Sequence, residues 1–241
     1  MTISAPSTPA VIPAYQAAPW IGTIVERTRT VLPEVLVVDD GSGDGTAEAA
    51  REAGAEVLSL PVNQGKGTAL RTAFEALFRR GHSQVVTLDA DGQHLPEEIP
   101  KLLAAAEETG ADLVLGSREH LFAQMSWLRR VSNRSSSQII SALAGLRLPD
   151  VQTGFRFYRR RLLEATGFPE SRFDAESTVV VRAGRLGLKV VAVPVELGQA
   201  DGRSTSHYRA LVDGLRIARS VVKARFERLP AAPAARTREA R

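Results

Sequence analysis

The sequence contains no cysteine among its 241 residues. A disulfide framework and a thiolate metal site are therefore excluded, and the composition suits a reducing compartment, so we expect a cytoplasmic protein. Aromatic residues make up only 5% of the chain and offer little surface for stacking on nucleic-acid bases. No run of about 18 uncharged apolar residues occurs, so a membrane-spanning helix is not expected. Residues 1–10 also lack the basic start and apolar core of an export signal.

Apolar residues account for 44% of the sequence, enough to build the core of one α/β domain. The formal net charge is +4 and the pI is about 9.8. A positive net charge favours binding of nucleic acid, anionic lipid or a phosphate-bearing substrate. The sign of the charge does not distinguish among these ligands.

Short apolar strands alternate with amphipathic helices along the chain. We expect strands at Ala10–Ala14, Val35–Asp39, Glu56–Leu60, Val85–Asp89, Asp112–Gly116 and Lys189–Val195. Two of the intervening helices carry apolar stripes, formed by Leu70, Phe74, Leu77 and Phe78 and by Ile99, Leu102, Leu103 and Ala106. This alternation predicts a mostly parallel central sheet flanked by helices.

The same pattern sets the expected domain limits. We expect a flexible N-terminus over residues 1–9 and a single domain over residues 10–228, including a basic C-terminal helix. Residues 229–241 are rich in Pro, Ala and Arg, which predicts a disordered tail.

An acidic loop, Asp89–His94, directly follows the apolar run Val85–Leu88. Two carboxylates this close raise each other's pKa unless a cation holds them, and oxygen ligands suit Mg²⁺ or Mn²⁺. A metal that keeps open positions can then bind a diphosphate. The alternative is a solvated loop in which Asp91-Gly92 forms a turn and Asp89 caps the next helix.

Two glycine-containing loops lie at the ends of the neighbouring elements. The segment Asp39–Thr46 is not a dinucleotide fingerprint, because threonine replaces the last glycine and two acids would face the pyrophosphate. Its acids suit hydrogen bonds from base and ribose groups, although an ordinary strand-to-helix turn is an alternative. The segment Asn63–Thr68 is not a P-loop, because Leu60 replaces the first glycine. Lys66 is a candidate to approach a nucleotide, or else this segment is a glycine-rich helix entrance.

Six segments together resemble one family. They are Ile12–Tyr15, Val37–Thr46, Asn63–Gly67, Asp89–His94, Gly116–Arg118 and Gly154–Arg156. In order and spacing they resemble family 2 glycosyltransferases, and most closely the branch of dolichyl-phosphate mannose synthase and bacterial polyprenyl-phosphate glycosyltransferases. The resemblance covers roughly residues 10 to 225.

The resemblance implies a GT-A fold, a nucleotide-sugar donor (a GDP- or UDP-hexose), a divalent cation and inversion at the anomeric carbon. By the same resemblance the nucleoside pocket is lined by Pro13, Tyr15, Asp39 and Asp40, and the metal and diphosphate are bound by Asp89, Asp91 and Gln93, with Ala90 and Lys66 also in the donor site. Gln16-Ala17 departs from the family, which usually has Asn-Glu at that position.

The acceptor decides which further residues the chemistry needs. A cation bound by Asp91 would neutralise charge on the leaving diphosphate. A lipid-phosphate acceptor is already anionic and requires cations, for which the candidates are Arg118, Arg130, Arg134 and Arg203. A hydroxyl acceptor instead requires a base, for which the candidates are Asp174 and Glu176, with a helix cap and first-turn acid as the alternative.

The segment Arg203–Leu229 predicts an amphipathic helix. Its apolar stripe is Leu211, Leu215, Ala218, Val222 and Phe226, flanked by six arginines and lysines. Such a helix suits an anionic membrane surface, or else it packs on the domain with a solvated basic face.

Our hypothesis from the sequence is a metal-dependent inverting hexosyltransferase that uses a polyprenyl phosphate acceptor at the inner face of the membrane. The first alternative is the same class of transferase with a hydroxyl acceptor on a small molecule, glycolipid or glycan. A non-catalytic nucleic-acid-binding module is disfavoured, because the acidic loops would repel a phosphate backbone. A sugar nucleotidyltransferase is also disfavoured, because no glycine-rich N-terminal loop with a basic residue is present.

Overall fold

A computed structural model of the chain describes residues 8–124, 127–198 and 210–229. The described strands are β1 (Ala10–Ala14), β2 (Val35–Asp39), β3 (Glu56–Ser59), β4 (Gln84–Thr87), β5 (Leu113–Ser117), β6 (Arg156–Arg159) and β7 (Val190–Pro194). The described helices are α1 (Ala18–Val31), α2 (Thr46–Glu52), α3 (Lys66–Arg79), α4 (Ile99–Thr109), α5 (Trp127–Ala144), α6 (Arg160–Thr166), α7 (Asp174–Arg185) and α8 (Ala210–Phe226), with 3-10 turns η1 (Pro96–Glu98) and η2 (Glu119–Gln124).

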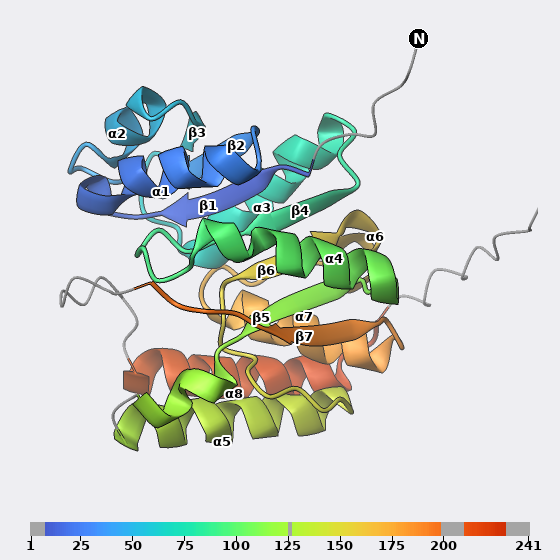
Figure 1. Ribbon diagram of the computed structural model, residues 1–241. Helices are drawn as coiled ribbons and strands as arrows, with labels where there is room; N and C mark the ends of the chain where they lie inside the picture. Colours follow the sequence, from blue (N-terminus) through green and yellow to red (C-terminus); the bar gives the residue numbers. More distant parts are fainter. Residues whose placement is uncertain (1–7, 125–126, 199–209, 230–241) are drawn as a thin grey trace, which may run out of the picture.

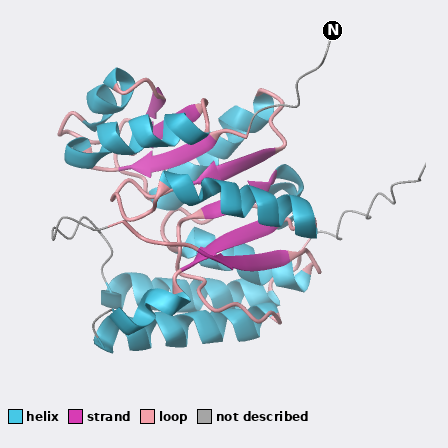
Figure 2. Cartoon of the chain, in the orientation of Figure 1, coloured by secondary structure: helices cyan, strands magenta, loops and turns pink. Residues whose placement is uncertain are grey.

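The seven described strands form one sheet in the order β3-β2-β1-β4-β6-β5-β7, with helices on both faces (Figures 1 and 2). All pairings are parallel except those of β6, which runs antiparallel to both β4 and β5. The predicted α/β class and mostly parallel sheet are confirmed. The six predicted strands are all present, and β1 and β2 have the predicted bounds.

Strand β6 is absent from the sequence prediction. It has only four residues and an arginine at each end, so its apolar content is too low to predict a buried strand. Arg156 is nevertheless only 1% exposed, because its guanidinium donates to the backbone carbonyls of Val151, Thr153 and Glu176. These tertiary contacts offset the cost of burying the charge.

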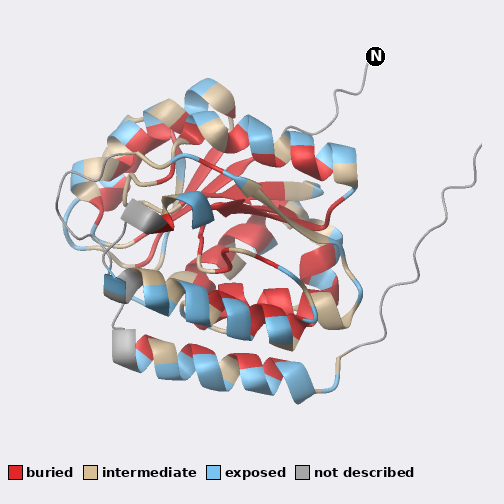
Figure 3. Cartoon of the chain, turned by 60° about the horizontal axis from the view of Figure 1, so that its bottom comes forward, coloured by how far each residue is buried: buried red, intermediate tan, exposed pale blue. Residues whose placement is uncertain are grey.

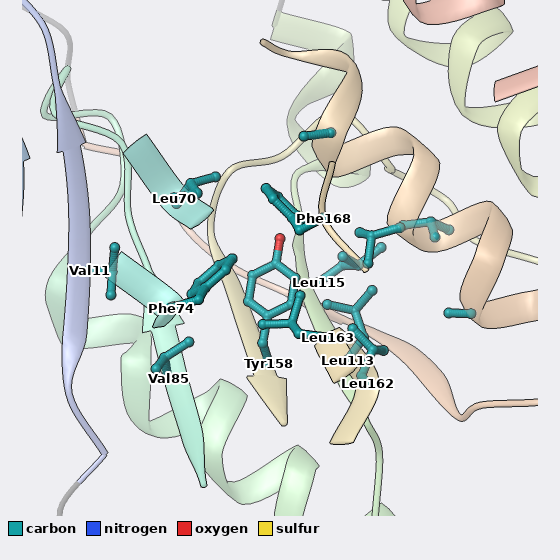
Figure 4. Packing of buried hydrophobic residues seen from close by; sticks show 14 of the residues in the cluster. Val11, Leu70, Phe74, Val85, Leu113, Leu115, Tyr158, Leu162, Leu163 and Phe168 are labelled. Carbon is teal, nitrogen blue, oxygen red and sulfur yellow. The ribbon is translucent and has the colours of Figure 1, made fainter. Parts of the chain in front are cut away.

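The alternation of side chains along each strand produces one core on each face of the sheet. Val11 faces the core beneath α3, α6 and α7, whereas Ala10 and Ile12 face the core beneath α1 and α4. In the first core, the Phe74 ring lies between Tyr158 and Phe168, with centroids 5.4 and 5.3 Å away (Figure 4). The predicted stripes of α3 and α4 lie in these two cores.

Helices α5 and α8, from the middle and the end of the chain, form an extra layer beneath the first core. α5 and α8 run side by side there and both pack on α7 (Figure 1). Of the described helices, none has the length and apolar content required to cross a bilayer. The predicted flexible N-terminus and disordered tail lie almost wholly outside the described residues, although the Pro9 carbonyl accepts a hydrogen bond from Val86 at 3.0 Å.

Candidate active site

A cavity of about 640 Å³ opens where β1, β2 and β4 end. The carboxyl ends of parallel strands are where α/β sheets bind ligands. Its lining includes seven predicted site residues, namely Pro13, Tyr15, Asp40, Lys66, Asp89, Ala90 and Asp91. Residues separated by as many as 78 positions in the chain are therefore gathered at one edge of the sheet.

The acidic loop is held in place by His94, Gly154 and Phe155, to which the sequence analysis assigned no individual role. The backbone N–H of Asp89 donates to Nδ1 of His94 at 3.0 Å, and the buried His94 ring stacks on Phe155 with centroids 5.3 Å apart. Burial lowers the pKa of His94, which keeps Nδ1 free of a proton and able to accept. Gly154 lies against the Asp89 carboxylate, where any Cβ would collide. The glycine of the Gly154–Arg156 motif thus makes room for Asp89.

Lys66 connects the acidic loop to α7. Its Nζ lies 2.5 Å from Asp89 Oδ1 and 2.7 Å from Glu176 Oε2. Burial by itself raises the pKa of Asp89, but the neighbouring cationic groups, first among them the Lys66 ammonium, together lower that pKa to about 2. Burial tends to lower the pKa of Lys66, but the two carboxylates raise it well above its usual value. Lys66 and Asp89 are therefore a charged pair at the cavity wall.

Asp91 lies in a different electrostatic environment. Its Oδ1 accepts a hydrogen bond from the backbone N–H of Gln93 at 3.0 Å, which closes the turn at Gly92. Burial and the neighbouring Asp89 charge raise the pKa of Asp91. Gln93 is half-buried and is absent from the cavity lining.

The two acids at the end of β2 accept hydrogen bonds from backbone N–H groups. Asp40 accepts from the N–H groups of Gln64 and Gly65, each at 2.7 Å, and so fixes the loop before α3. Burial raises the pKa of Asp40, and the two backbone donors oppose the rise. Asp39 accepts from Ser42 N at 3.1 Å and does not line the cavity. Of these two acids, Asp40 lines the cavity in which the nucleoside is predicted to bind, and Asp39 does not.

Gln16 adopts a left-handed backbone conformation beside that pocket, with φ of +51°. Its N–H donates to Ser42 Oγ at 2.8 Å, which ties the end of β1 to the end of β2. Asparagine adopts positive φ angles more readily than most residues. The Asn usual at this position in the family that the sequence resembles would therefore fit this backbone conformation better than Gln16 does.

Three of the four predicted cationic residues, including the exposed Arg134 of α5, do not line the cavity, and the fourth is not described. Arg118 is paired with the fully buried Asp150, its Nε 2.8 Å from Asp150 Oδ2, and does not line the cavity. Arg130 lies on α5, outside the cavity lining as described. Arg203 lies outside the described residues.

Arg172 and Arg216 line the cavity instead. Within the described part of the chain, neither guanidinium forms a hydrogen bond or an ion pair. The one feature of the sequence that could have indicated a role for Arg216 was its position in the predicted basic C-terminal helix. Arg172 carried no such signal, because its place at the cavity depends on how the loop before α7 folds.

The two candidate bases are both first-turn acids of α7, and the N-cap is Phe173, so the helix cap of the alternative interpretation is not formed by either acid. Asp174 Oδ2 accepts from Ser220 Oγ of α8 at 2.6 Å, and Glu176 accepts from Lys66. Asp174 Oδ1 and Glu176 Oε1 are buried and have no hydrogen-bond partner among the described residues. Neither carboxylate lines the cavity.

The oxygen ligands at the cavity fit a divalent cation whose remaining coordination positions are filled by the substrate. Asp89 and Asp91 provide oxygen ligands only, as Mg²⁺ and Mn²⁺ prefer. In the described residues, no group of three or more acidic or histidine side chains is placed to hold a metal. Mg²⁺ commonly binds through one or two carboxylates together with substrate phosphates, which matches this pair.

Comparison with known proteins agrees with this geometry. The profile of glycosyl transferase family 2 matches residues 10–167. The undecaprenyl-phosphate mannosyltransferase of Micrococcus luteus is 33% identical over 208 residues, which cover 79% of this chain and 85% of that protein. The polyprenol monophosphomannose synthase of Mycolicibacterium smegmatis is 34% identical over 199 residues, which cover 77% of this chain and 75% of that protein.

A solved structure shares the fold. Glucosyl-3-phosphoglycerate synthase from Mycobacterium tuberculosis, in complex with Mn²⁺, uridine-diphosphate and phosphoglyceric acid, has a TM-score of 0.68 and 24% identity, covering 90% of this chain and 77% of that one. This likeness supports the GT-A architecture of the chain.

Proposed function

Because the chain belongs to glycosyl transferase family 2, we propose that it moves a hexose from a nucleoside diphosphate sugar to a polyprenyl phosphate, with inversion and with a divalent cation. The chain is a glycosyltransferase, and relatives named as polyprenyl-phosphate mannosyltransferases support the acceptor. The observation that carries the proposal is the meeting of Asp40, Lys66, Asp89 and Asp91 at one cavity.

The chain's own groups have distinct tasks in this proposal. Pro13, Tyr15 and Asp40 line the part of the cavity beside β1 and β2, where the nucleoside binds. Asp89 and Asp91 hold the cation, which neutralises charge on the leaving diphosphate. Lys66 keeps Asp89 ionised and directed into the cavity. Its ammonium has three donors, two of which the carboxylates occupy, so one remains for a diphosphate oxygen.

The placement of the candidate bases favours a phosphate acceptor over a hydroxyl. A hydroxyl must lose a proton to a base within hydrogen-bond reach, whereas a phosphate oxygen is already anionic. Asp174 is hydrogen-bonded to Ser220, and Glu176 to Lys66, and neither lines the cavity. The cavity-lining cations Arg172 and Arg216 suit an anionic acceptor.

We also propose that α5 and α8 contact an anionic membrane, at the cytoplasmic face where the acceptor's phosphate is presented. Seven of the eight large apolar side chains that the described residues expose lie on these two helices, namely Trp127, Val131, Ile139, Val212, Leu215, Val222 and Phe226. Figure 3 shows exposed residues along the outer faces of the two helices in this layer. Basic side chains flank them on both helices. Apolar and basic groups on one face are typical of peripheral membrane binding.

A thermal-shift panel tests the donor site. UDP, GDP and their hexose conjugates, each with Mn²⁺, should raise the Tm of the wild type, since a ligand at about 100 times its Kd stabilises by about 2.7 kcal/mol. For a chain of this size that corresponds to a rise in Tm of roughly 5–10 °C. Asp91→Asn should abolish the rise, whereas Glu75→Gln, an exposed acid of α3, should keep it. An undiminished shift in Asp91→Asn would refute the proposed donor site.

A further inference from the structure

Glu176 is a buried carboxylate to which the proposed function gives no task. It lies in the first turn of α7 and is 6% exposed. Its Oε2 lies 2.7 Å from Lys66 Nζ, but its Oε1 has no hydrogen-bond partner among the described residues. Arg156 Nε is 3.7 Å from this oxygen and donates instead to the Thr153 carbonyl at 2.7 Å. A buried carboxylate oxygen without a hydrogen bond costs stability, so packing alone does not account for a glutamate here.

The contact between Glu176 and Lys66 is built into the backbone. Glycines flank the lysine on both sides, and a Cβ at either Gly65 or Gly67 would collide with the backbone of Ser171 in the loop before α7. Because neither glycine has a side chain, the start of α3 lies directly against that loop. This close approach places the Lys66 ammonium 2.7 Å from Glu176 Oε2.

Glu176 changes how Lys66 acts on the acidic loop. The ammonium lies 2.5 Å from Asp89 Oδ1, where it competes with a divalent cation for the same carboxylate. Because the ammonium also contacts Glu176, the charge of Glu176 offsets part of the ammonium's charge. The negative charges of Asp89 and Asp91 therefore remain available to a divalent cation. Without the charge of Glu176, Lys66 would neutralise Asp89 more completely.

We propose that Glu176 is a positioning residue for the cation site, which raises the affinity of Asp89 and Asp91 for a divalent cation by offsetting the charge of Lys66. This inference rests on the proposed function, because that function assigns the cation to the two aspartates. It gives Glu176 a role other than that of a base. Glu176 does not line the cavity, and the role requires no contact with either substrate.

Electron paramagnetic resonance of free Mn²⁺ tests this role in the full chain, with Mn²⁺ alone as the ligand. Glu176→Gln keeps the shape of the side chain and removes its charge, so it should weaken Mn²⁺ binding roughly tenfold. Glu176→Asp keeps the charge but withdraws it from Lys66, and it should weaken Mn²⁺ binding about threefold. The control Glu75→Gln, which removes an exposed acid of α3, should leave Mn²⁺ binding unchanged.

A second background shows whether Glu176 acts through Lys66. In Lys66→Met the ammonium is absent, so adding Glu176→Gln should weaken Mn²⁺ binding by less than about threefold. A residue that only stabilises the fold would have the same effect on Mn²⁺ binding in both backgrounds. Circular dichroism and urea unfolding identify the variants that are folded, and Glu176→Asp decides the question if Glu176→Gln does not fold.

The outcomes separate this inference from the proposed function. If the folded Glu176 variants bound Mn²⁺ as tightly as the wild type, this inference would be wrong and the donor site would stand. If Glu176→Asp bound Mn²⁺ as weakly as Glu176→Gln, the shape of the side chain rather than its charge would be responsible, and the inference would also be wrong. Mn²⁺ binding that persisted unchanged in Asp91→Asn would instead refute the proposed donor site, and this inference with it.

Discussion

At the scale of single residues, Lys66 decides the character of the site. One ammonium lies between two carboxylates of different elements, so Asp89 stays ionised although it is largely enclosed. The family resemblance placed Lys66 near the donor, but not against Glu176. The lysine thus holds in position the aspartate that we propose as a ligand of the divalent cation.

Replacement of Lys66 tests this role. Lys66→Met leaves two enclosed carboxylates without their cation, so we expect a loss of about 3 kcal/mol in the free energy of unfolding without metal. Mn²⁺ alone should then raise the Tm of the variant more than that of the wild type, since it replaces the missing positive charge. Lys101→Met, which removes an exposed lysine paired with Glu98, is the matched control. Equal Mn²⁺ responses in all three proteins would contradict this interpretation.

At the scale of elements, the junction of α7 with α8 positions the cavity's outer wall. Arg182 of α7 pairs with Glu170 in the preceding loop, and its Nε lies 2.6 Å from Glu227 Oε1 after α8. Arg185 donates to the Ala224 and Glu227 carbonyls at the same end. These contacts hold α8 so that Val212 and Arg216 reach the cavity.

The Glu170 pair makes stability depend on pH. Burial raises the pKa of Glu170, but its hydrogen bonds and its charge pair with Arg182 together lower that pKa below the ordinary glutamate value of 4.5. A lowered pKa means that the stabilisation is present above the unfolded value and is lost as pH falls through the folded value. Glu170→Gln should therefore cost about 1.5 kcal/mol near pH 7.

Urea unfolding near pH 7 and about pH 3.5 checks this prediction, and the difference between wild type and Glu170→Gln should shrink at the lower pH. Glu164→Gln removes a pair whose carboxylate side chain is 58% exposed, so it should cost less than about 0.5 kcal/mol at either pH. If Glu170→Gln lowered the free energy of unfolding equally at both pH values, the charge of Glu170 would not be the source of the stabilisation.

At the scale of the whole molecule, the α5 and α8 layer lies on one side of the sheet while the cavity opens at the sheet edge (Figure 1). Because α8 contributes to both the exposed apolar face and the cavity lining, a membrane at that face would lie next to the site. The molecule would then meet its lipid acceptor without a membrane-spanning helix in the part described.

Vesicle sedimentation tests this arrangement. Trp127→Ser/Phe226→Ser removes side chains that are 66% and 77% exposed, and should weaken binding to phosphatidylglycerol vesicles at least about tenfold. Val62→Ser removes an equally apolar side chain, 62% exposed, from another part of the surface and should have no effect. High salt should weaken binding of the wild type. Unchanged vesicle binding by the double variant would show that this face is not the membrane-binding surface.

The sequence by itself determined the α/β class, six of the seven described strands and seven of the residues that line the cavity. These features depend on local properties: alternation of apolar runs, glycine-rich turns, and acids placed directly after strands. Because parallel strands end at one edge, Asp40 and Asp89 were brought together by topology that alternation already predicts.

Only the tertiary structure decided the remainder. β6 is held by hydrogen bonds from Arg156 to distant carbonyls, and Arg118 forms an ion pair with Asp150. Of the predicted stripe of α8, Leu215, Ala218, Val222 and Phe226 are exposed. In each case the outcome depends on a partner far away in the chain. Helical spacing identifies an apolar face, but when a helix has two such faces, only the surface of its neighbour decides which one is buried.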